Sequence, residues 1–197
     1  MKKLLLTMLV MFVGFYMIKY FSSVYSADVA FEEGQKYMSA GDYETALLKA
    51  NKSIRLNPME PNYYRGRAKV YLAYLVEVNN RDSQKILKQA ALEDLKTAYS
   101  LNPHNLVTIR NSIPLYYFLA AEDLTRPGNE DNVDEEFLPE TIYFYKLVKD
   151  ISPDDVGVYV LLAKYEKRLG LFEAYQESVE KVRELRPDLL EWHESFK

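Results

Sequence analysis

Apolar residues recur along most of the chain at the three- and four-residue spacing that is typical of α-helices. Four of these helical patterns end in the same phrase, an aliphatic residue followed by one other residue and a proline. Because proline cannot continue a helix, each phrase marks a helix end. The phrases are Leu56-Asn57-Pro58, Leu101-Asn102-Pro103, Ile151-Ser152-Pro153 and Leu185-Arg186-Pro187. Their prolines are 45, 50 and 34 residues apart, which predicts a set of internal helical repeats.

The stretch before the first of these prolines indicates the type of repeat. Small and aromatic residues share one helical face, a Gly-Asp pair ends that helix, and a second helical pattern follows. The residues that carry this pattern are Gly34, Tyr37, Gly41, Asp42, Tyr43, Ala46, Ala50 and Ser53. The pattern resembles the tetratricopeptide repeat (TPR), a 34-residue helix–turn–helix unit. Gly34 and Ala46 are small enough to let two antiparallel helices approach closely.

The resemblance implies an all-α, right-handed solenoid of about four units, with an apolar helix before it and a capping helix after it. The expected segments are 1–26, the units 27–60, 61–103, 104–153 and 154–189, and the cap 190–197. The second unit has 11 extra residues around 76–87, which we expect to lengthen both of its helices. Most of the 18 extra residues of the third unit lie in an acidic stretch, 122–136, expected to be a mobile, solvated loop. Pro114 predicts a kink in that unit's first helix.

The first 26 residues have a different composition from the rest. A basic tip, Met1-Lys2-Lys3, leads into an uncharged apolar run from Leu4 to Ile18. This pattern is typical of a signal peptide cleaved before Ala27, or of an uncleaved signal anchor that crosses the membrane with residues 4–25. The weak cleavage site and the aromatic residues after the run favour the anchor. The tip should stay cytoplasmic, which places the rest on the extracytoplasmic side of a bacterial-type membrane, or outside the cell if the segment is cleaved.

The composition excludes most kinds of catalytic site. The chain has no cysteine, two histidines and seven glycines, and no phosphate-loop, nucleophile-elbow or zinc-protease motif. Its acidic pairs lie on helical patterns with a lysine three or four residues away, which is typical of solvated faces. We therefore expect no catalytic residue, no metal and no cofactor. The formal net charge of −4 argues against a nucleic-acid partner.

The resemblance to the TPR family implies that the first helix of each unit lines a concave surface that binds peptides. Five of the twenty residues expected there are cationic and only Asp28 is anionic, although the chain beyond the N-terminal segment carries a net charge of −7. The predicted groove residues are Arg65, Lys69, Lys164, Lys167, Arg168, Phe31, Gln35 and Asn62. We expect a non-catalytic protein–protein interaction scaffold that captures an acidic segment or a terminal carboxylate, with Arg65 and Lys69 as the central contacts. The alternative is that these cations only solvate a helix face.

The sequence also bears on functions other than the binding of an acidic peptide. A cytosolic co-chaperone role is not supported, because three positions of the carboxylate clamp found in chaperone-binding relatives are Phe31, Gln35 and Gly66 here. Residues 60–64 and 101–105 resemble repeat tails of O-antigen-ligase-like enzymes, which suggests an accessory factor in surface-polysaccharide assembly. An enzyme with a site in the acidic stretch or in the third repeat, or a glycan-binding protein, is another alternative. Glycan binding would need the rings of Tyr116, Tyr117, Tyr143 and Tyr145 to be exposed. Self-association through an exposed apolar face is a further alternative.

Overall fold

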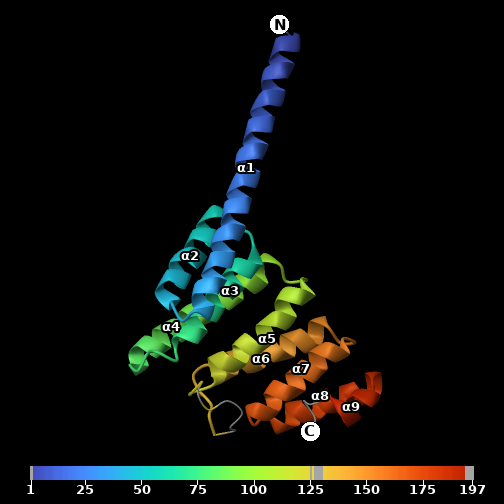
Figure 1. The fold of residues 1–197 in the computed structure, drawn as a ribbon. Coiled ribbons are helices and arrows are strands. Elements are labelled where there is room, and N and C mark those ends of the chain that lie inside the picture. Colours follow the sequence, from blue (N-terminus) through green and yellow to red (C-terminus); the bar gives the residue numbers. More distant parts are fainter. Residues whose placement is uncertain (1, 125, 127–130, 194–197) are drawn as a thin grey trace.

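The structure is a computed structural model that describes residues 2–124, 126 and 131–193. Within these ranges the chain forms helices and no strand, apart from an isolated bridge between Ala121 and Val133. The helices are α1 (Lys2–Ser39), α2 (Tyr43–Leu56), α3 (Pro61–Tyr74), α4 (Arg81–Leu101), α5 (Leu106–Ala120), α6 (Leu138–Ile151), α7 (Val156–Arg168), α8 (Phe172–Leu185) and α9 (Asp188–Trp192). They stack as successive antiparallel pairs (Figure 1), as the repeated pattern predicts.

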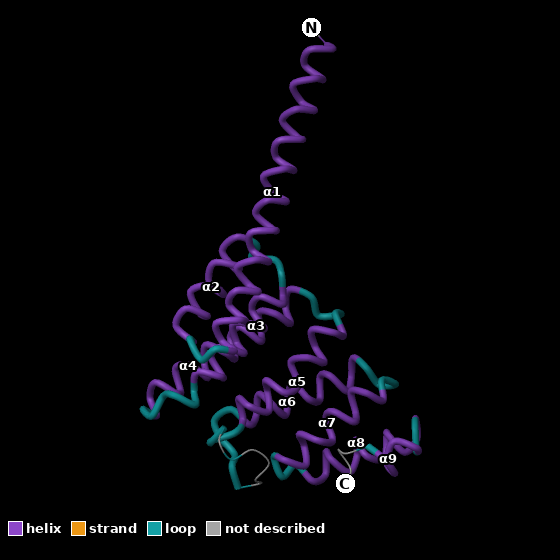
Figure 2. The backbone as a smooth tube through the Cα atoms, viewed as in Figure 1, coloured by secondary structure: helices purple, strands orange, loops and turns teal. Residues whose placement is uncertain are grey.

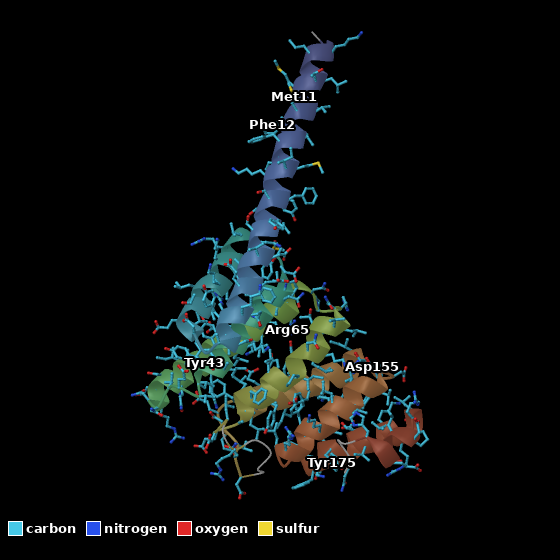
Figure 3. The ribbon with its side chains drawn as sticks, in the orientation of Figure 1. Met11, Phe12, Tyr43, Arg65, Asp155 and Tyr175 are labelled. Carbon is cyan, nitrogen blue, oxygen red and sulfur yellow. The ribbon has the colours of Figure 1, made fainter. Side chains whose placement is uncertain are left out.

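Helix α1 is uninterrupted and serves two parts of the molecule. Its first half projects away from every other helix (Figures 1 and 2), and side chains such as Met11 and Phe12 extend from it without a neighbour (Figure 3). From Ala27 onward the helix packs against α2 and α3, and Ala27 and Ala30 are buried. The expected boundary between residues 26 and 27 therefore lies inside a single helix. In the described part of the chain, α1 is the helix long and apolar enough to cross a membrane.

The turns between helices use local signals that the sequence carries. Asp42, Asn80, Asn105 and Asp155 precede α2, α4, α5 and α7, and each accepts a hydrogen bond from a backbone N–H of the first turn. These side chains satisfy donors that a helix start leaves unpaired. Gly41 ends the turn before α2 with a φ of 82°, a backbone conformation that favours glycine. The positions at which these helices begin are thus set by short-range chemistry.

Close approach of the paired helices depends on small residues at their contacts. A Cβ added to Gly34 would lie 3.3 Å from both the Ala46 carbonyl oxygen and the Lys49 Cβ, so α1 and α2 have room for glycine at this level. Ala46, Ala50 and Ser53 form the buried face of α2. The contact predicted between Gly34 and Ala46 is therefore confirmed.

The tyrosines of the third unit belong mostly to the core. Tyr116, Tyr117 and Tyr145 are buried, and Tyr116 stacks on Phe144 with ring centroids 3.9 Å apart. The Tyr145 hydroxyl donates a hydrogen bond to the Ile113 carbonyl in α5 at 3.2 Å. Of the four tyrosines considered for a glycan platform, Tyr143 alone is exposed, at 66%. Three of the four rings therefore pack helix against helix and cannot stack on a sugar.

The two insertions are accommodated differently from what the sequence suggested. Helix α3 ends at Tyr74, so the prediction that both helices of the second unit lengthen is wrong, and α4 alone extends to 21 residues. The described flanks of the 122–136 stretch are hydrogen-bonded to each other, although Glu122, Glu135 and Glu136 are exposed as expected. Asn132 is buried and exchanges hydrogen bonds with the Asp123 backbone at 2.6 and 2.7 Å. The centre of that stretch, residue 125 and residues 127–130, lies outside the described residues.

The C-terminal end is covered by α9. Leu189 and Leu190 are partly buried against a small apolar cluster of α7 and α8 that contains Tyr159, Val160 and Val182. An outward apolar face at the end of a helical array needs such a cover. The expected cap, residues 190–197, lies only in part within the described residues, and residues 194–197 and the Trp192 side chain fall outside them.

Candidate peptide-binding surface

Four of the predicted groove residues lie together where α1 meets α3. We call Phe31, Gln35, Asn62 and Arg65 the Arg65 cluster. Phe31 and Gln35 lie directly over Gly66. A Cβ added to Gly66 would be 3.3 Å from Gln35 Nε2 and 3.0 Å from Phe31 Cζ, and it would overlap Phe31 Cε2. The Phe31 ring also packs on Tyr63, with centroids 5.3 Å apart. Gly66 therefore leaves space that two side chains of α1 fill.

Arg65 is a partly buried cation that forms no direct ion pair with the described residues, although Glu60 lies near it. Its Nη2 donates to Asn62 Oδ1 at 3.0 Å, and Asn62 Nδ2 in turn donates to Glu60 Oε1 at 2.7 Å. Its Nε is buried and has no hydrogen-bond partner among the described residues. Among the described ion pairs none includes Arg65. Burial lowers the pKa of the guanidinium from its ordinary value, and Glu60 offsets only part of that effect.

Two further buried donors near this surface lack a partner in the chain. They are Gln35 Nε2 in α1 and Thr108 Oγ1 in α5. Thr108 holds the same position in the third unit as Arg65 in the second and Phe31 in the first, counting from 104, 61 and 27. Buried polar groups are normally paired, and leaving one unpaired costs about 1–3 kcal/mol. Unused donors are thus found on three successive first helices.

A second group of cations lies on α7, and we call Lys164, Lys167 and Arg168 the α7 cations. Lys164 Nζ lies 5.6 Å from the centre of the Tyr165 ring, and the Arg168 guanidinium lies 5.9 Å from both Tyr165 and Tyr117 of α5. Arg168 therefore reaches from α7 toward the neighbouring first helix. Lys167 instead lies 5.8 Å from Tyr175, on α8. Lys69, one turn after Arg65, is exposed on α3.

Arg110 of α5 lies against the start of α7, and it is not among the groove residues predicted from the sequence. A Cβ added to Gly157 would lie 2.6 Å from Arg110 Nη2 and 2.9 Å from its Cζ. The guanidinium therefore rests on the bare first turn of α7. The available signal was Gly157 itself, because a glycine inside the first turn of a helix leaves room for a large side chain from a neighbour.

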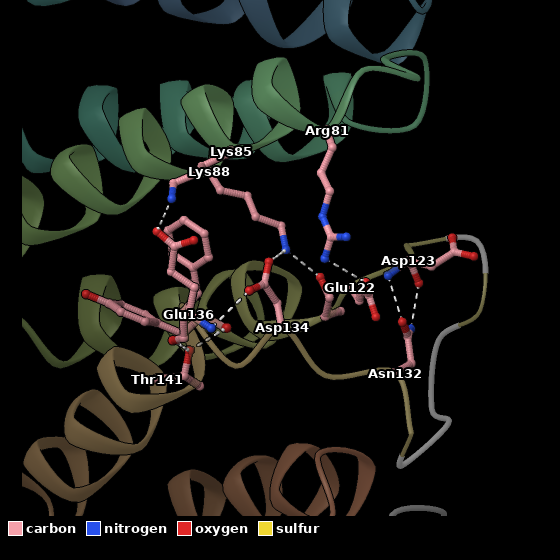
Figure 4. Close-up of polar contacts among 12 residues, drawn as sticks. Arg81, Lys85, Lys88, Glu122, Asp123, Asn132, Asp134, Glu136 and Thr141 are labelled. Carbon is pink, nitrogen blue, oxygen red and sulfur yellow. Dashed lines mark hydrogen bonds and ion pairs between the residues drawn. The ribbon is translucent and has the colours of Figure 1, made fainter.

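A different set of charges joins the two insertions (Figure 4), and we call it the insertion contact. Three basic residues of α4 face three acidic residues of the 122–136 stretch. The pairs are Arg81 with Glu122 at 3.3 Å, Lys85 with Glu136 at 2.8 Å and Lys88 with Asp134 at 2.6 Å. Lys88 is only 4% exposed and also donates to the Ala121 carbonyl at 2.7 Å. Each of these cations forms a direct ion pair with a carboxylate, whereas Arg65 forms none with the described residues.

One buried carboxylate lies away from the concave side. Glu166 is 1% exposed, lies 3.0 Å from Lys149 Nζ and accepts a hydrogen bond from Ser178 Oγ at 2.7 Å. Burial raises its pKa, and Lys149 and Ser178 offset only part of the increase. Lys149, Glu166 and Ser178 join α6, α7 and α8, so we assign this group a structural role. In the described ranges, no three His, Asp or Glu side chains are grouped so that they could hold a metal ion.

Comparison with known proteins identifies the fold but not the function. No known family profile matches the sequence, and no curated protein matches it. Among solved structures, TTC0263, a thermophilic TPR protein of Thermus thermophilus, superimposes with a TM-score of 0.51 and 19% identity, covering 82% of this chain and 75% of that one. The MamA protein gives a TM-score of 0.49 at 17% identity, covering 85% and 76%. The first TPR of Spaghetti (RPAP3), bound to the HSP90 peptide SRMEEVD, gives 0.46 at 19%, covering 82% and 97%. The predicted α-solenoid of TPR-like units is confirmed as the fold.

Proposed function

We propose that the protein is a non-catalytic interaction scaffold that binds an acidic peptide segment on its concave side, while α1 holds it in a membrane. The proposed binding of an acidic peptide rests on the surroundings of Arg65. A partly buried guanidinium with a buried, unpaired Nε is unfavourable unless a partner arrives. A carboxylate is the partner that matches its geometry best, because it can accept two parallel hydrogen bonds.

Other cations extend the proposed surface beyond the Arg65 cluster. Lys69 lies one turn further along α3, Arg110 rests on the start of α7, and Lys164 and Arg168 follow on that helix. A peptide crossing α3, α5 and α7 would meet positive charge at each helix. This spacing favours an extended acidic segment over a single small anion. The partner would thus be recognised by charge and length together.

The membrane part of the proposal rests on the projecting half of α1. From Leu4 to Tyr25 the helix is about 33 Å long, enough for a hydrocarbon core of ~30 Å. Large apolar side chains along it are exposed, and Tyr20, Phe21 and Tyr25 at its inner end suit a membrane interface. We infer that the lysine-bearing tip is cytoplasmic and the repeats are extracytoplasmic.

Retention of this segment is favoured over cleavage by a contact at the junction. Ser23 Oγ donates to the Leu56 carbonyl at the end of α2, at 3.0 Å. Cleavage before Ala27 would remove this donor and the preceding turns that continue into the packed part of α1. An anchor that is also part of the first repeat explains why a helix of 38 residues runs through without a break.

The alternative functions have less support. A glycan platform in the third repeat would have Tyr143 alone as an exposed ring, because Tyr116, Tyr117 and Tyr145 are buried. A role in surface-polysaccharide assembly stays a prediction from two short sequence phrases. Self-association stays a prediction, which a mass measurement on the purified full chain would test.

Peptide binding to the full chain in lipid nanodiscs tests the proposal. A labelled synthetic peptide rich in glutamate is compared with the same peptide carrying glutamine at every glutamate. Fluorescence anisotropy should show binding of the acidic peptide only, with an affinity that falls as salt is added. Equal binding of the two peptides, or an affinity independent of salt, would contradict the proposal.

A further inference from the structure

The wall of the proposed groove and the proposed anchor are parts of the same helix. Phe31 and Gln35 lie on α1, as does Tyr25, the last large exposed apolar residue of the projecting half. At 1.5 Å per residue, Phe31 is about 9 Å and Gln35 about 15 Å beyond Tyr25 along the helix axis. The first part of the groove is therefore within about three helical turns of the anchor's end.

This short distance is held rigidly. No proline or glycine lies between Tyr25 and Gly34, and Gly34 itself is packed against α2. Ala27 and Ala30 are buried against the neighbouring helices, and the Ser23 hydrogen bond to Leu56 fixes the turn before them. Hinges in helices need a local cause such as proline, glycine pairs or a bulge, and this junction has none of them. The groove thus keeps one distance and one orientation relative to the anchor.

Arg65 lies at the same level as Phe31. It neighbours Gly66, the residue that the Phe31 ring covers, and it is on the first turns of α3, close to where α2 ends beside Ser23. The polar layer of a bilayer adds roughly 5–8 Å beyond each side of its hydrocarbon core. The Arg65 guanidinium is therefore just outside the lipid headgroups when α1 spans the membrane.

From this geometry we propose that the peptide bound by the groove is an acidic segment located immediately next to the transmembrane span of another membrane protein. The inference rests on the proposed function. A segment leaving the bilayer is already at the height of Arg65, whereas a soluble partner has to be captured from solution. Tethering to the same membrane also raises its effective concentration at the groove.

A lipid headgroup is a poorer occupant than a peptide. A headgroup could reach Arg65 from the bilayer, but the cationic positions continue to Lys164 and Arg168 on α7. In Figure 1, α7 is well separated from the projecting half of α1. A single headgroup cannot cover that distance, and an extended acidic segment can. The continuity of charge away from the membrane therefore favours the peptide.

The test uses the full chain in vesicles of neutral phosphatidylcholine. The probe is the glutamate-rich peptide attached to a lipid by a short spacer, by a long flexible spacer, or left free in solution. We expect the short-spacer probe to be captured about tenfold more strongly than the long-spacer probe at equal surface density. Inserting a flexible Gly-Ser segment between Tyr25 and Ser26 should remove that preference, because the groove is then no longer held near the membrane.

A helical insertion at the same point is the matched control. Seven alanines would lift the groove by about 10 Å and leave it facing nearly the same direction, so the preference should move to the longer spacer. Free peptide binding with no spacer preference would overturn the inference and leave the proposed function standing. Failure of every probe to bind would reject both. Loss of peptide binding when anionic lipid is added at constant salt would assign Arg65 to headgroups and overturn the inference.

Discussion

The guanidinium of Arg67 and the carboxylate of Asp94 form a two-bond ion pair, with Nε to Oδ2 at 2.8 Å and Nη2 to Oδ1 at 2.7 Å. Arg65, two residues earlier on α3, has no such carboxylate. The two arginines have different partners, because Arg67 binds Asp94 of α4 and Arg65 donates to Asn62 within α3. The same residue type therefore forms a buried ion pair at one position and no ion pair with the described residues at the other.

Replacing Arg67 should destabilise the repeats. The Asp94 side chain is only 6% exposed, so Arg67→Gln leaves a buried carboxylate without its counter-charge. The free energy of unfolding should fall by about 3 kcal/mol. Urea unfolding followed by circular dichroism measures the change. Arg183→Gln, in an exposed pair on α8, is the matched control and should leave the midpoint unchanged.

The insertion contact should depend on its buried lysine. Lys88→Met removes the donor to Asp134 and to the Ala121 carbonyl, and we expect a loss of about 2–3 kcal/mol. Hydrogen exchange at the backbone amides of residues 121–124 and 131–134 should rise strongly. Lys85→Met on the same helix changes an exposed pair and should have little effect. Equal exchange in the two variants would show that Lys88 does not hold the insertions together.

The close packing at Gly66 makes a specific prediction about coupling. Gly66→Ala in a helix normally raises stability, but here the new Cβ would overlap the Phe31 ring, so a loss of about 1–3 kcal/mol is expected. Phe31→Leu frees the overlapped space, and the double variant should be more stable than the sum of the two single effects predicts. Thermal unfolding of the four proteins measures this coupling. Additive effects would mean that Phe31 does not cover Gly66.

Stability should depend on pH through Glu166. Burial raises the pKa of this carboxyl above its ordinary value of 4.5, so the folded state binds the proton more tightly than the unfolded state. The free energy of unfolding should therefore fall as the pH rises from 4.5 through the folded pKa. The Glu166→Gln variant should not show this fall in the free energy of unfolding. The free energy of unfolding of the wild type, measured relative to the variant, should therefore decrease over that pH interval. A relative stability that increases with pH would indicate a lowered pKa instead.

Much of the fold was predictable from the sequence, because its signals are local. The four proline phrases, the Gly41 turn and the small residues Gly34 and Ala46 act over a few residues each, and the helix pairs follow from them. The end of α3 at Tyr74 was not predictable in this way. Whether an insertion lengthens one helix or two depends on where α4 finds contacts, such as those between Lys88 and Asp134.

The candidate site was predictable only in part. The repeat pattern indicated which residues lie on the first helices, but not which of them are paired. The repeat positions placed Arg65, and not Arg67, among the groove residues, but they did not show that Arg67 pairs with Asp94, 27 residues further along the chain. Arg110 was missed for a related reason, because its place on the surface depends on the neighbouring Gly157.

The most direct test of the central claim is the affinity of the full chain in nanodiscs for the glutamate-rich peptide before and after Arg65→Gln. If Arg65 receives a carboxylate, the variant should bind about tenfold or more weakly. Its unfolding midpoint should not fall, because an unpaired buried charge has been removed. Arg183→Gln makes the same charge change on α8 and should bind as the wild type does. An Arg65→Gln protein that binds the peptide with wild-type affinity would contradict the account.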